Sequence, residues 1–419
     1  MSLDQRIYGG DQMSNIETSN SYQYVIVGGG MVAGYAIKGI RQEDTSGSIL
    51  VVSKEADVPY ERPALSKKLW LDDEFTEENI RIGAEDFSDV SFKFNTTVNQ
   101  IDRQNKTVDL GDNTTVHYGQ LLLATGGEPR NIKGPDDPHV LIFRNWSDYR
   151  KLRKFSGNNK HVVIIGGGYV GTELASSLTQ NNTKVTMVFP EKALGEGKFP
   201  EEIRAEYEET FKKNGVEILS GKMVESYQRQ GDHLVISTAD GSEITADTII
   251  IGLGVTPRIE LAKASELDLA DGGVKVDEHL QTSDPSIWSA GDIASYPDHI
   301  LGRQRIEHVD HARLSGELVG KNMAGANLAY EHTPYFYSMI FDISWQAVGS
   351  INPELQQVFD KRDNGTIVYF LKDNKLAGVL VWNVVVDLDD VRDLIANPPA
   401  NEQLVGSIKE KLADHKLNN

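Results

Sequence analysis

The chain has 419 residues, of which 39% are hydrophobic and 25% are charged, and it is long enough for two or three domains that each bury a core. Its formal net charge of −20 disfavours general binding to the phosphate backbone of nucleic acids. It contains no cysteine, which excludes disulfides, thiolate zinc sites, cysteine-ligated iron–sulfur clusters and thiol-based redox chemistry, so any redox reaction needs a bound cofactor.

The first 21 residues predict a flexible N-terminus. They carry acidic and polar residues but neither the apolar segment of a signal peptide nor the Arg-rich pattern of a transit peptide. No apolar run in the chain approaches the roughly 20 residues that span a bilayer. We therefore expect a cytoplasmic protein without a membrane span.

The first organised stretch is YQYVIVGGGMVAGYA, at residues 22–36. An apolar strand pattern leads into the turn Gly28-x-Gly30-x-x-Ala33, and a helical pattern follows it. A second strand, SILVVS, comes next and is followed by Glu55. The stretch closes with TVDLGDNTTVHYGQLLLATG, in which strand, turn and strand end on a glycine. This order is typical of a nucleotide-binding βα unit, with Ala33 as an allowed variant of the third glycine.

The same plan returns 130 to 140 residues further along, in HVVIIGGGYVGTELA at 161–175. Here the turn is Gly166-x-Gly168-x-x-Gly171, and a strand TKVTMVF and Glu191 follow it. A charged amphipathic helix, another strand and a β-meander complete the second copy. Because strands and helices alternate in both copies, we predict an α/β fold with two Rossmann-like domains built on parallel sheets.

The glycines of each turn predict where a dinucleotide binds. The first allows a tight turn, the second lets backbone amides approach a pyrophosphate, and the third lets helix and strand pack closely. The helix N-terminus then places its partial positive charge against the phosphates. A lone copy of this pattern is a weak signal. Two copies, each with a strand before it and an acid after it, indicate two dinucleotides held face to face.

The two acids predict partners for ribose. A carboxylate at the end of the second strand accepts hydrogen bonds from ribose hydroxyls and repels a 2′-phosphate. Glu191 fits that role, which favours NADH over NADPH, and Glu55 fits it in the first copy. Two nearby cations, Lys192 and Lys198, weaken the inference, because either could accommodate a phosphate. A solvated acid at a helix start remains the alternative interpretation of Glu191.

Five stretches together resemble the FAD-dependent pyridine-nucleotide reductases, in the branch that holds apoptosis-inducing factor, monodehydroascorbate reductase and ferredoxin reductase. They are PYERPALSKKLW (59–70), LLLATGGEPR (121–130), VVIIGGGYVGTELA (162–175), SIWSAGDIASYPD (286–298) and GRQRIEHVDHARLSGELVGKNMAG (302–325). The resemblance covers roughly residues 22 to 390. It implies an FAD-binding domain at 22–135 and 252–330, an NAD(P)H-binding domain inserted at 136–251, and a C-terminal α/β domain of the interface type at 331–419.

The resemblance also implies roles for single residues. On the FAD side it assigns cofactor contacts to Gly28, Gly30, Ala33, Glu55, Arg62, Lys67, Arg130, Asp292, Glu307, His308 and Tyr337. On the NADH side it assigns contacts to Gly168, Tyr169, Val170 and Gly171. Gly166 of the second fingerprint, and Glu191 and Lys198 after the next strand, complete the predicted NADH-binding residues.

Three of these residues are assigned to catalysis by the same resemblance. Tyr169 is an aromatic gate over the flavin ring, and Lys67 and Glu173 form an ion pair beside flavin N5. The pair also makes physical sense by itself. A charge near N5 tunes the electron affinity of the ring, and it has to be held in place and balanced.

The sequence departs from apoptosis-inducing factor at three positions, where Val309, Tyr337 and Gln346 replace a histidine, a tryptophan and a glutamate. These changes leave cofactor binding intact but give no basis for transferring a signalling role. His308 and His311 are three residues apart and could be mistaken for metal ligands. No separate cluster completes such a set, so no metal is predicted.

The leading hypothesis is an FAD flavoprotein that takes hydride from NADH and passes electrons to an acceptor other than a disulfide. The absence of cysteine leaves a ferredoxin or rubredoxin, a radical such as monodehydroascorbate, a quinone or dioxygen as acceptors. The alternative is a redox sensor that resembles apoptosis-inducing factor, in which slow turnover lets the NADH-bound form change dimerisation or partner binding. Both hypotheses leave open whether the chain forms a homodimer.

Overall fold

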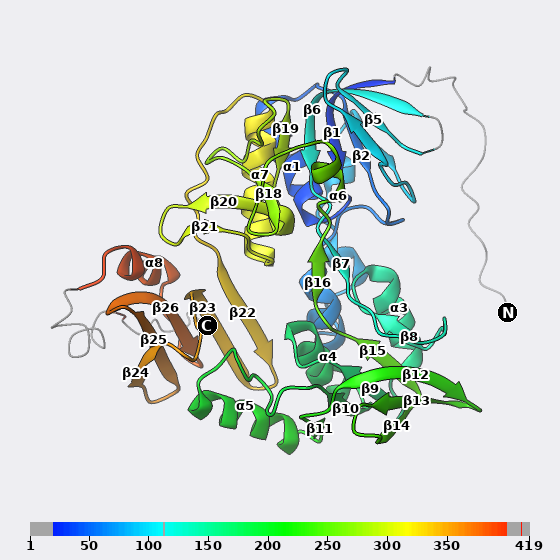
Figure 1. The fold of residues 1–419 in the computed structure, drawn as a ribbon, viewed down its shortest axis with the longest axis vertical. Coiled ribbons are helices and arrows are strands. Elements are labelled where there is room, and N and C mark those ends of the chain that lie inside the picture. Colours follow the sequence, from blue (N-terminus) through cyan, green and yellow to red (C-terminus); the bar gives the residue numbers. More distant parts are fainter. Residues whose placement is uncertain (1–19, 112–113, 400–411, 413–419) are drawn as a thin grey trace.

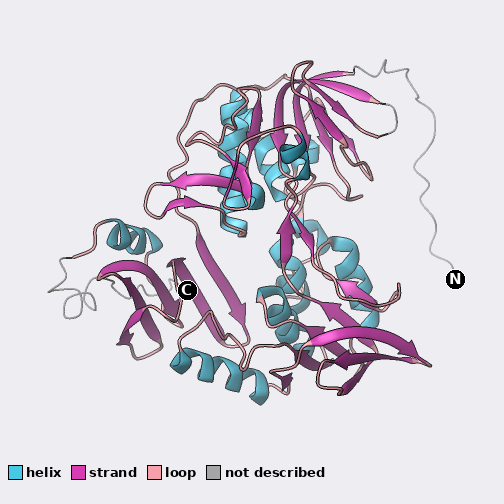
Figure 2. Ribbon diagram, in the orientation of Figure 1, coloured by secondary structure: helices cyan, strands magenta, loops and turns pink. Residues whose placement is uncertain are grey.

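The computed structural model describes residues 20–111, 114–399 and 412, so all but the last two residues of the predicted flexible N-terminus lie outside the described part. Figure 1 shows three groups of elements, one around β1 and α7 at the top, one around β9 below it, and the sheet β22–β26 at the left. Helices and strands occur together in all three groups (Figure 2). None of the helices in the described residues is long and apolar enough to cross a membrane.

The first sheet is built around β1, the strand that leads into Gly28. Its order is β3-β2-β1-β6-β5-β4, with β19 beside β6, and β1, β2, β3, β6 and β19 run parallel. The inner strand β2 is buried along its whole length, as expected for a parallel sheet covered on both faces. The strands are β1 Ser21–Val27, β2 Ile49–Val52, β3 Val90–Lys93, β4 Gln100–Asp102, β5 Thr107–Asp109, β6 Thr115–Leu123 and β19 Ile287–Ser289.

Two helices far apart in sequence, α1 (Met31–Glu43) and α7 (Val309–Met323), lie side by side against this sheet (Figure 1). Glycines let their backbones approach, since a Cβ on Gly39 would lie 2.1 Å from the Glu317 carbonyl oxygen and one on Gly320 would lie 2.1 Å from that of Ala36. This packing brings the start of α7 to the first glycine-rich turn. A small sheet next to it has the order β17-β18-β20-β21, with β17 Leu269–Ala270, β18 Gly273–Lys275, β20 Ala294–Asp298 and β21 Gly302–Gln304.

The second sheet repeats the plan with five parallel strands in the order β11-β10-β9-β15-β8. An antiparallel sheet, β12-β13-β14, accompanies it. The strands are β8 Val140–Ile142, β9 His161–Ile165, β10 Lys184–Val188, β11 Glu217–Leu219, β12 Val224–Gln230, β13 His233–Thr238, β14 Glu243–Ala246 and β15 Thr248–Ile251. The helices of this part are α3 Trp146–Phe155, α4 Tyr169–Gln180 and α5 Glu201–Lys213.

The two turns after β1 and β9 have the same construction. Gly28 and Gly166 both have a positive φ, of 118° and 115°. A Cβ on Gly28 would lie 2.1 Å from the Ala124 carbonyl oxygen, and one on Gly166 would lie 2.3 Å from that of Gly252. Each turn therefore passes directly against the end of the neighbouring strand, β6 or β15, and only glycine fits there. The predicted α/β class with two Rossmann-like units is confirmed.

The chain passes between the two sheets on a pair of antiparallel strands, β7 (Gly127–Pro129) and β16 (Val255–Pro257). It leaves the first sheet through β7 and comes back through β16, so β8 to β15 form an insertion between β6 and β19. The short helices among the described residues are α2 Lys68–Leu71, α6 Glu260–Ala264 and four 3₁₀ helices at Arg62–Ser66, Glu77–Ile80, Ala84–Asp86 and Gly291–Ile293.

The C-terminal sheet is antiparallel, in the order β22-β23-β26-β25-β24. Trp345 and Trp382 are fully buried where this sheet meets α5, and the Trp382 indole donates a hydrogen bond of 3.1 Å to Glu206 on that helix. The elements are β22 Tyr335–Ile340, β23 Ile343–Gly349, β24 Gln356–Lys361, β25 Thr366–Lys372, β26 Lys375–Trp382 and α8 Leu388–Ala396.

Candidate active site

One cavity of about 1370 Å³ joins the two parallel sheets and the C-terminal sheet. Both glycine-rich turns reach it, since Gly28 and Gly30 line one part and Gly168 lines another. Pockets for one small molecule are usually about 300–1,000 Å³. The cavity is therefore large enough to take two ligands side by side.

Most of the residues predicted from the sequence line this cavity. They are Gly28, Gly30, Glu55, Arg62, Lys67, Gly168, Tyr169, Val170, Glu173, Lys198, Asp292, Glu307, His308 and Tyr337. Five others lie outside its lining: Ala33, Arg130, Gly166, Gly171 and Glu191.

Three of these five shape the turns. Ala33 is fully buried in α1, Gly166 supplies the positive φ described above, and a Cβ on Gly171 would lie 2.5 Å from the Gly166 carbonyl oxygen. The other two are exposed. Arg130 donates its backbone N–H to the Gly254 carbonyl, and Glu191 accepts a hydrogen bond from Gly221 at its own carbonyl.

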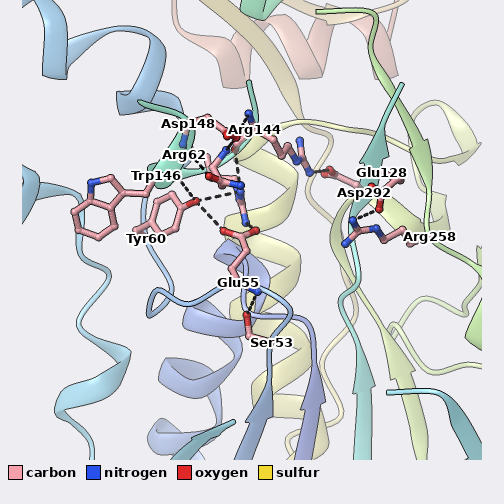
Figure 3. A network of polar contacts seen from close by, with 11 residues as sticks. Ser53, Glu55, Tyr60, Arg62, Glu128, Arg144, Trp146, Asp148, Arg258 and Asp292 are labelled. Atoms are coloured by element: carbon pink, nitrogen blue, oxygen red, sulfur yellow. Dashed lines mark hydrogen bonds and ion pairs between the residues drawn. The ribbon is translucent and has the colours of Figure 1, made fainter. Parts of the chain in front are cut away.

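A polar network fills the part of the cavity next to the first turn (Figure 3). Arg62 Nη2 lies 2.6 Å from Glu55 Oε1, and the Tyr60 hydroxyl donates to Glu55 Oε2 at 2.9 Å. Burial raises the pKa of Glu55, but the charge and hydrogen bond of Arg62 outweigh it and hold the pKa below its usual value. Glu55 is thus an ionised carboxylate that keeps Arg62 in place.

Arg144 is a second cation of this network that the sequence did not reveal. Its guanidinium lies 3.6 Å from the Asp292 carboxylate, and its carbonyl accepts a hydrogen bond of 3.0 Å from Arg62 (Figure 3). Burial lowers the pKa of Arg144 and raises that of Asp292. A Cβ on Gly30 would come within 3.7 Å of Arg62 Nη2, so at least one of the two guanidiniums lies directly against the first turn. Two partly buried arginines at a glycine-rich turn fit a pyrophosphate.

Glu173 connects all three parts of the fold. Its carboxylate lies 2.7 Å from Lys67 Nζ and accepts hydrogen bonds of 2.6 Å from Ser66 and 2.8 Å from Ser338. The side chains of Lys67 and Glu173 are 15% and 7% exposed, and Lys67 Nζ also lies 5.0 Å from the centre of the Tyr337 ring. The predicted pair is therefore formed, and two serines that sequence reasoning missed complete it.

His308 enters the cavity at the start of α7. As the N-cap, its Nδ1 accepts a hydrogen bond from the Asp310 backbone N–H, which leaves the proton on Nε2. Burial lowers the pKa of His308 to about 4, with the Asp310 carboxylate opposing and Lys67 adding to the shift. His308 is therefore neutral at pH 7, with rings of Tyr335, Phe336 and Tyr337 around it.

His311 does not line the cavity that His308 enters. Its ring is fully buried, stacks on Tyr296 and bonds the Tyr330 hydroxyl. Within the described ranges no three His, Asp or Glu side chains gather as a metal-binding group. Glu307, the last predicted residue of this region, lies 2.6 Å from Arg305 Nη1.

The sequence profile of the pyridine nucleotide-disulphide oxidoreductase family matches residues 22–316. The chain belongs to this family. Apoptosis-inducing factor 1 of Dictyostelium discoideum is 31% identical over 91% of this chain and 80% of its own length. Monodehydroascorbate reductase 4 of Arabidopsis thaliana is 32% identical over 85% of this chain and 78% of its own length.

Two solved structures of the family share the fold over nearly the whole chain. The reductase in the putidaredoxin reductase–putidaredoxin complex has a TM-score of 0.83 and 27% identity, and it covers 93% of this chain and 98% of its own. A ferredoxin reductase of Rhodopseudomonas palustris has a TM-score of 0.80 and 26% identity over the same shares. The predicted branch of the family is thereby confirmed.

The family membership establishes the chain as a flavoprotein oxidoreductase with FAD and NAD(P)H as cofactors. Since the chain has no cysteine, it carries no redox-active disulfide, although the family is named after one. The names of the relatives place them in mitochondria or peroxisomes, and the cytoplasmic location stays a prediction from the sequence.

Proposed function

We propose that this oxidoreductase takes hydride from NADH and passes electrons to an acceptor that is not a disulfide. The observation that carries the proposal is the single cavity in which both glycine-rich turns meet and the Lys67–Glu173 pair lies. FAD, when bound, supplies the chemistry by accepting the hydride and giving up the electrons. The protein supplies binding, orientation and charge.

Residues 22–135 and 252–330 would hold FAD. Gly28 and Gly30 let the backbone approach the pyrophosphate, and Arg62 and Arg144 balance its charge. Asp292 would accept hydrogen bonds from the ribityl hydroxyls, and Glu55 from ribose, because each carboxylate oxygen can accept more than one bond. Arg62 is paired with Glu55 and Arg144 with Asp292 (Figure 3), which keeps these side chains in position for the cofactor.

Residues 136–251 would hold NADH, with Gly168, Val170 and the start of α4 at its pyrophosphate. Tyr169 covers the place of the nicotinamide. Glu191 lies after β10, where an acid disfavours a 2′-phosphate, and this supports NADH over NADPH.

Residues from all three parts would act at the flavin ring. Lys67 would carry the positive charge beside N5, and Glu173, fixed by Ser66 and Ser338, holds that ammonium in place. The C-terminal residues 331–419 contribute Tyr337 next to Lys67. His308 offers a neutral N–H donor rather than a second positive charge.

The acceptor would be a small redox protein or a small molecule. The relatives include monodehydroascorbate reductases and reductases of ferredoxin and putidaredoxin, which supports both classes. The net charge of −20 opposes an acceptor protein that is strongly acidic over its whole surface. It also underlies the expectation that the chain does not bind nucleic acid.

A stopped-flow experiment tests this proposal. The protein with FAD is reduced by NADH without oxygen and then mixed with a ferredoxin, monodehydroascorbate generated in situ, a quinone or oxygenated buffer. The proposal requires that at least one of these four acceptors reoxidises the protein fast and supports repeated turnover with NADH. Slow reoxidation by all of them, together with an NADH-dependent change in oligomeric state, would support the redox-sensor alternative instead.

A further inference from the structure

The hydroxyl group of Tyr60 joins three other groups of the chain at one oxygen atom (Figure 3). It donates a hydrogen bond of 2.9 Å to Glu55 Oε2, and it accepts one of 3.2 Å from Arg62 Nη1 and one of 3.0 Å from the Trp146 backbone N–H. A tyrosine hydroxyl offers one donor and two acceptor positions, so all three are used. Tyr60 is 1% exposed and does not line the cavity, so it acts on a ligand there only through its partners.

Two of the three partners, Glu55 and Arg62, line the cavity beside the first glycine-rich turn. Both oxygens of the Glu55 carboxylate are engaged, Oε1 by Arg62 at 2.6 Å and Oε2 by Tyr60. The carboxylate therefore cannot rotate without breaking one of these bonds, and its remaining lone pairs keep a fixed direction. An acceptor that is already fixed loses little freedom when a hydroxyl group of a ligand binds it, which favours binding.

The third partner belongs to the inserted part of the chain. Trp146 is the first residue of α3, and the first N–H groups of a helix have no acceptor within the helix. The Tyr60 oxygen supplies that acceptor, and the rings of Tyr60 and Trp146 lie 5.4 Å apart. The residue that fixes Glu55 therefore also caps the first helix of the region proposed to bind NADH.

We propose that Tyr60 is a positioning residue, which holds Glu55 for the adenosine ribose of FAD and links that end of the cofactor site to α3. The proposal rests on the proposed function, in which Glu55 accepts hydrogen bonds from ribose. Tyr60→Phe is the informative change, because it removes the hydroxyl and keeps the ring. That ring lies against Trp146, and its centre is 5.1 Å from the Arg62 guanidinium.

The first measurement is the Kd of FAD in wild type, Tyr60→Phe, Glu55→Ala and the double variant. Dilution of the FAD-containing protein releases flavin, and the flavin fluorescence gives the Kd. We expect Tyr60→Phe to weaken binding about tenfold, the size of one hydrogen bond to a charged group. In the Glu55→Ala background the same change should have almost no effect, because the carboxylate that Tyr60 positions is gone. An equal loss in both backgrounds would overturn the proposal, as would no loss at all.

The pH profile of the Kd separates positioning from a general loss of stability. Burial raises the pKa of Glu55, but the charge of Arg62 and the hydrogen bonds from Arg62 and Tyr60 hold it below its usual value. Arg144 lowers this pKa further, and the Asp148 carboxylate interacts with Glu55 unfavourably. Without the hydroxyl the pKa of Glu55 rises. On acidification, Tyr60→Phe should therefore lose FAD affinity at a higher pH than wild type, and profiles of the same shape would contradict the positioning role.

Hydrogen exchange at the Trp146 amide, measured with excess FAD, tests the link to α3. Exchange should be slowest in wild type and fastest in Tyr60→Phe, in which the amide has lost its acceptor. Glu55→Ala should lie between them, because the hydroxyl is present but no longer held by the carboxylate. If Glu55→Ala exchanges at the rate of wild type, the link is refuted.

Tyr149→Phe is the matched control. Tyr149 lies on α3, is 5% exposed and loses a single buried hydrogen bond of 3.1 Å to the Leu69 carbonyl. This variant should leave the Kd of FAD and its pH profile unchanged. If wild type binds no FAD at all, the proposed function itself fails. Normal FAD binding by wild type, with additive effects of Tyr60→Phe and Glu55→Ala, refutes only the role of Tyr60.

Discussion

The side chains of Lys67 and Glu173 lie 2.7 Å apart, although 106 residues separate them in the chain. Lys67 follows the 3₁₀ helix Arg62–Ser66 beside the first sheet, and Glu173 belongs to α4 of the second. The contact therefore fixes one glycine-rich turn relative to the other. Ser338 ties the C-terminal sheet to the same carboxylate.

The first prediction concerns this pair. Lys67→Ala or Glu173→Ala alone leaves a charge unpaired in a nearly buried site, which should lower the free energy of unfolding by about 3–5 kcal/mol. Each should also slow flavin reduction by NADH or shift the flavin potential. The double variant should lose much less than the sum, because the pair can be broken only once. Urea unfolding and anaerobic stopped-flow reduction measure both effects.

The exposed pair Lys213–Glu209 is a matched control, since its groups lie 3.9 Å apart with side chains 71% and 57% exposed. Its alanine variants should change stability by less than about 1 kcal/mol. Additive effects of Lys67→Ala and Glu173→Ala on the reduction rate would mean that the two residues do not act together at the ring.

A second prediction distinguishes two arginines. Arg144 lines the cavity beside Asp292, whereas the Arg130 side chain is exposed outside it. Arg144→Met should therefore weaken FAD binding about tenfold or more, since a charge-assisted contact to phosphate is lost. Arg130→Met should leave FAD binding almost unchanged. Fluorescence titration of the apoprotein with FAD gives both constants, and equal losses would restore the role that the resemblance gave to Arg130.

The third prediction concerns the choice of nicotinamide cofactor. Glu191→Ala removes a negative charge from the place of the 2′-phosphate, and we expect the preference for NADH over NADPH to narrow roughly twofold to fivefold, because the carboxylate is exposed. Lys192→Ala, next to it and equally exposed, should widen the preference. The rates of flavin reduction by NADH and by NADPH at equal concentrations measure this preference. A wild type that reduces equally fast with NADPH would show that Glu191 has no such role.

The fourth prediction concerns acid stability. The pKa of His308 is about 4 in the folded protein, below its ordinary 6.5, so the unfolded chain binds this proton first as the pH falls. The contribution of neutral His308 to the free energy of unfolding is fully present above pH 6.5. It is lost as the pH falls towards 4, and at pH 4.5 the loss is about 2–3 kcal/mol.

His308→Asn removes this titration but keeps an N-cap acceptor for α7, so the variant should lose less stability between pH 7 and 4.5 than wild type. Urea midpoints at both pH values measure the difference. An identical pH dependence in His308→Asn and wild type would contradict the neutral state of His308.

The backbone of the site could be predicted from the sequence more completely than its side chains. Gly28 and Gly166 are required by a local turn against one neighbouring strand, so a short motif predicts them. Arg144 and Ser338 act on partners 82 and 165 residues away, and no local pattern marks them. Arg130 shows the reverse case, since it ends a matching motif but lies outside the cavity.

The proposed function depends above all on FAD and NADH meeting in the cavity of about 1370 Å³. The most direct test is the absorbance spectrum of the purified protein during an anaerobic titration with NADH. We predict a yellow protein whose flavin bands bleach as NADH is added. A colourless protein that cannot be reconstituted with FAD, or flavin bands that NADH leaves unchanged, would contradict the account.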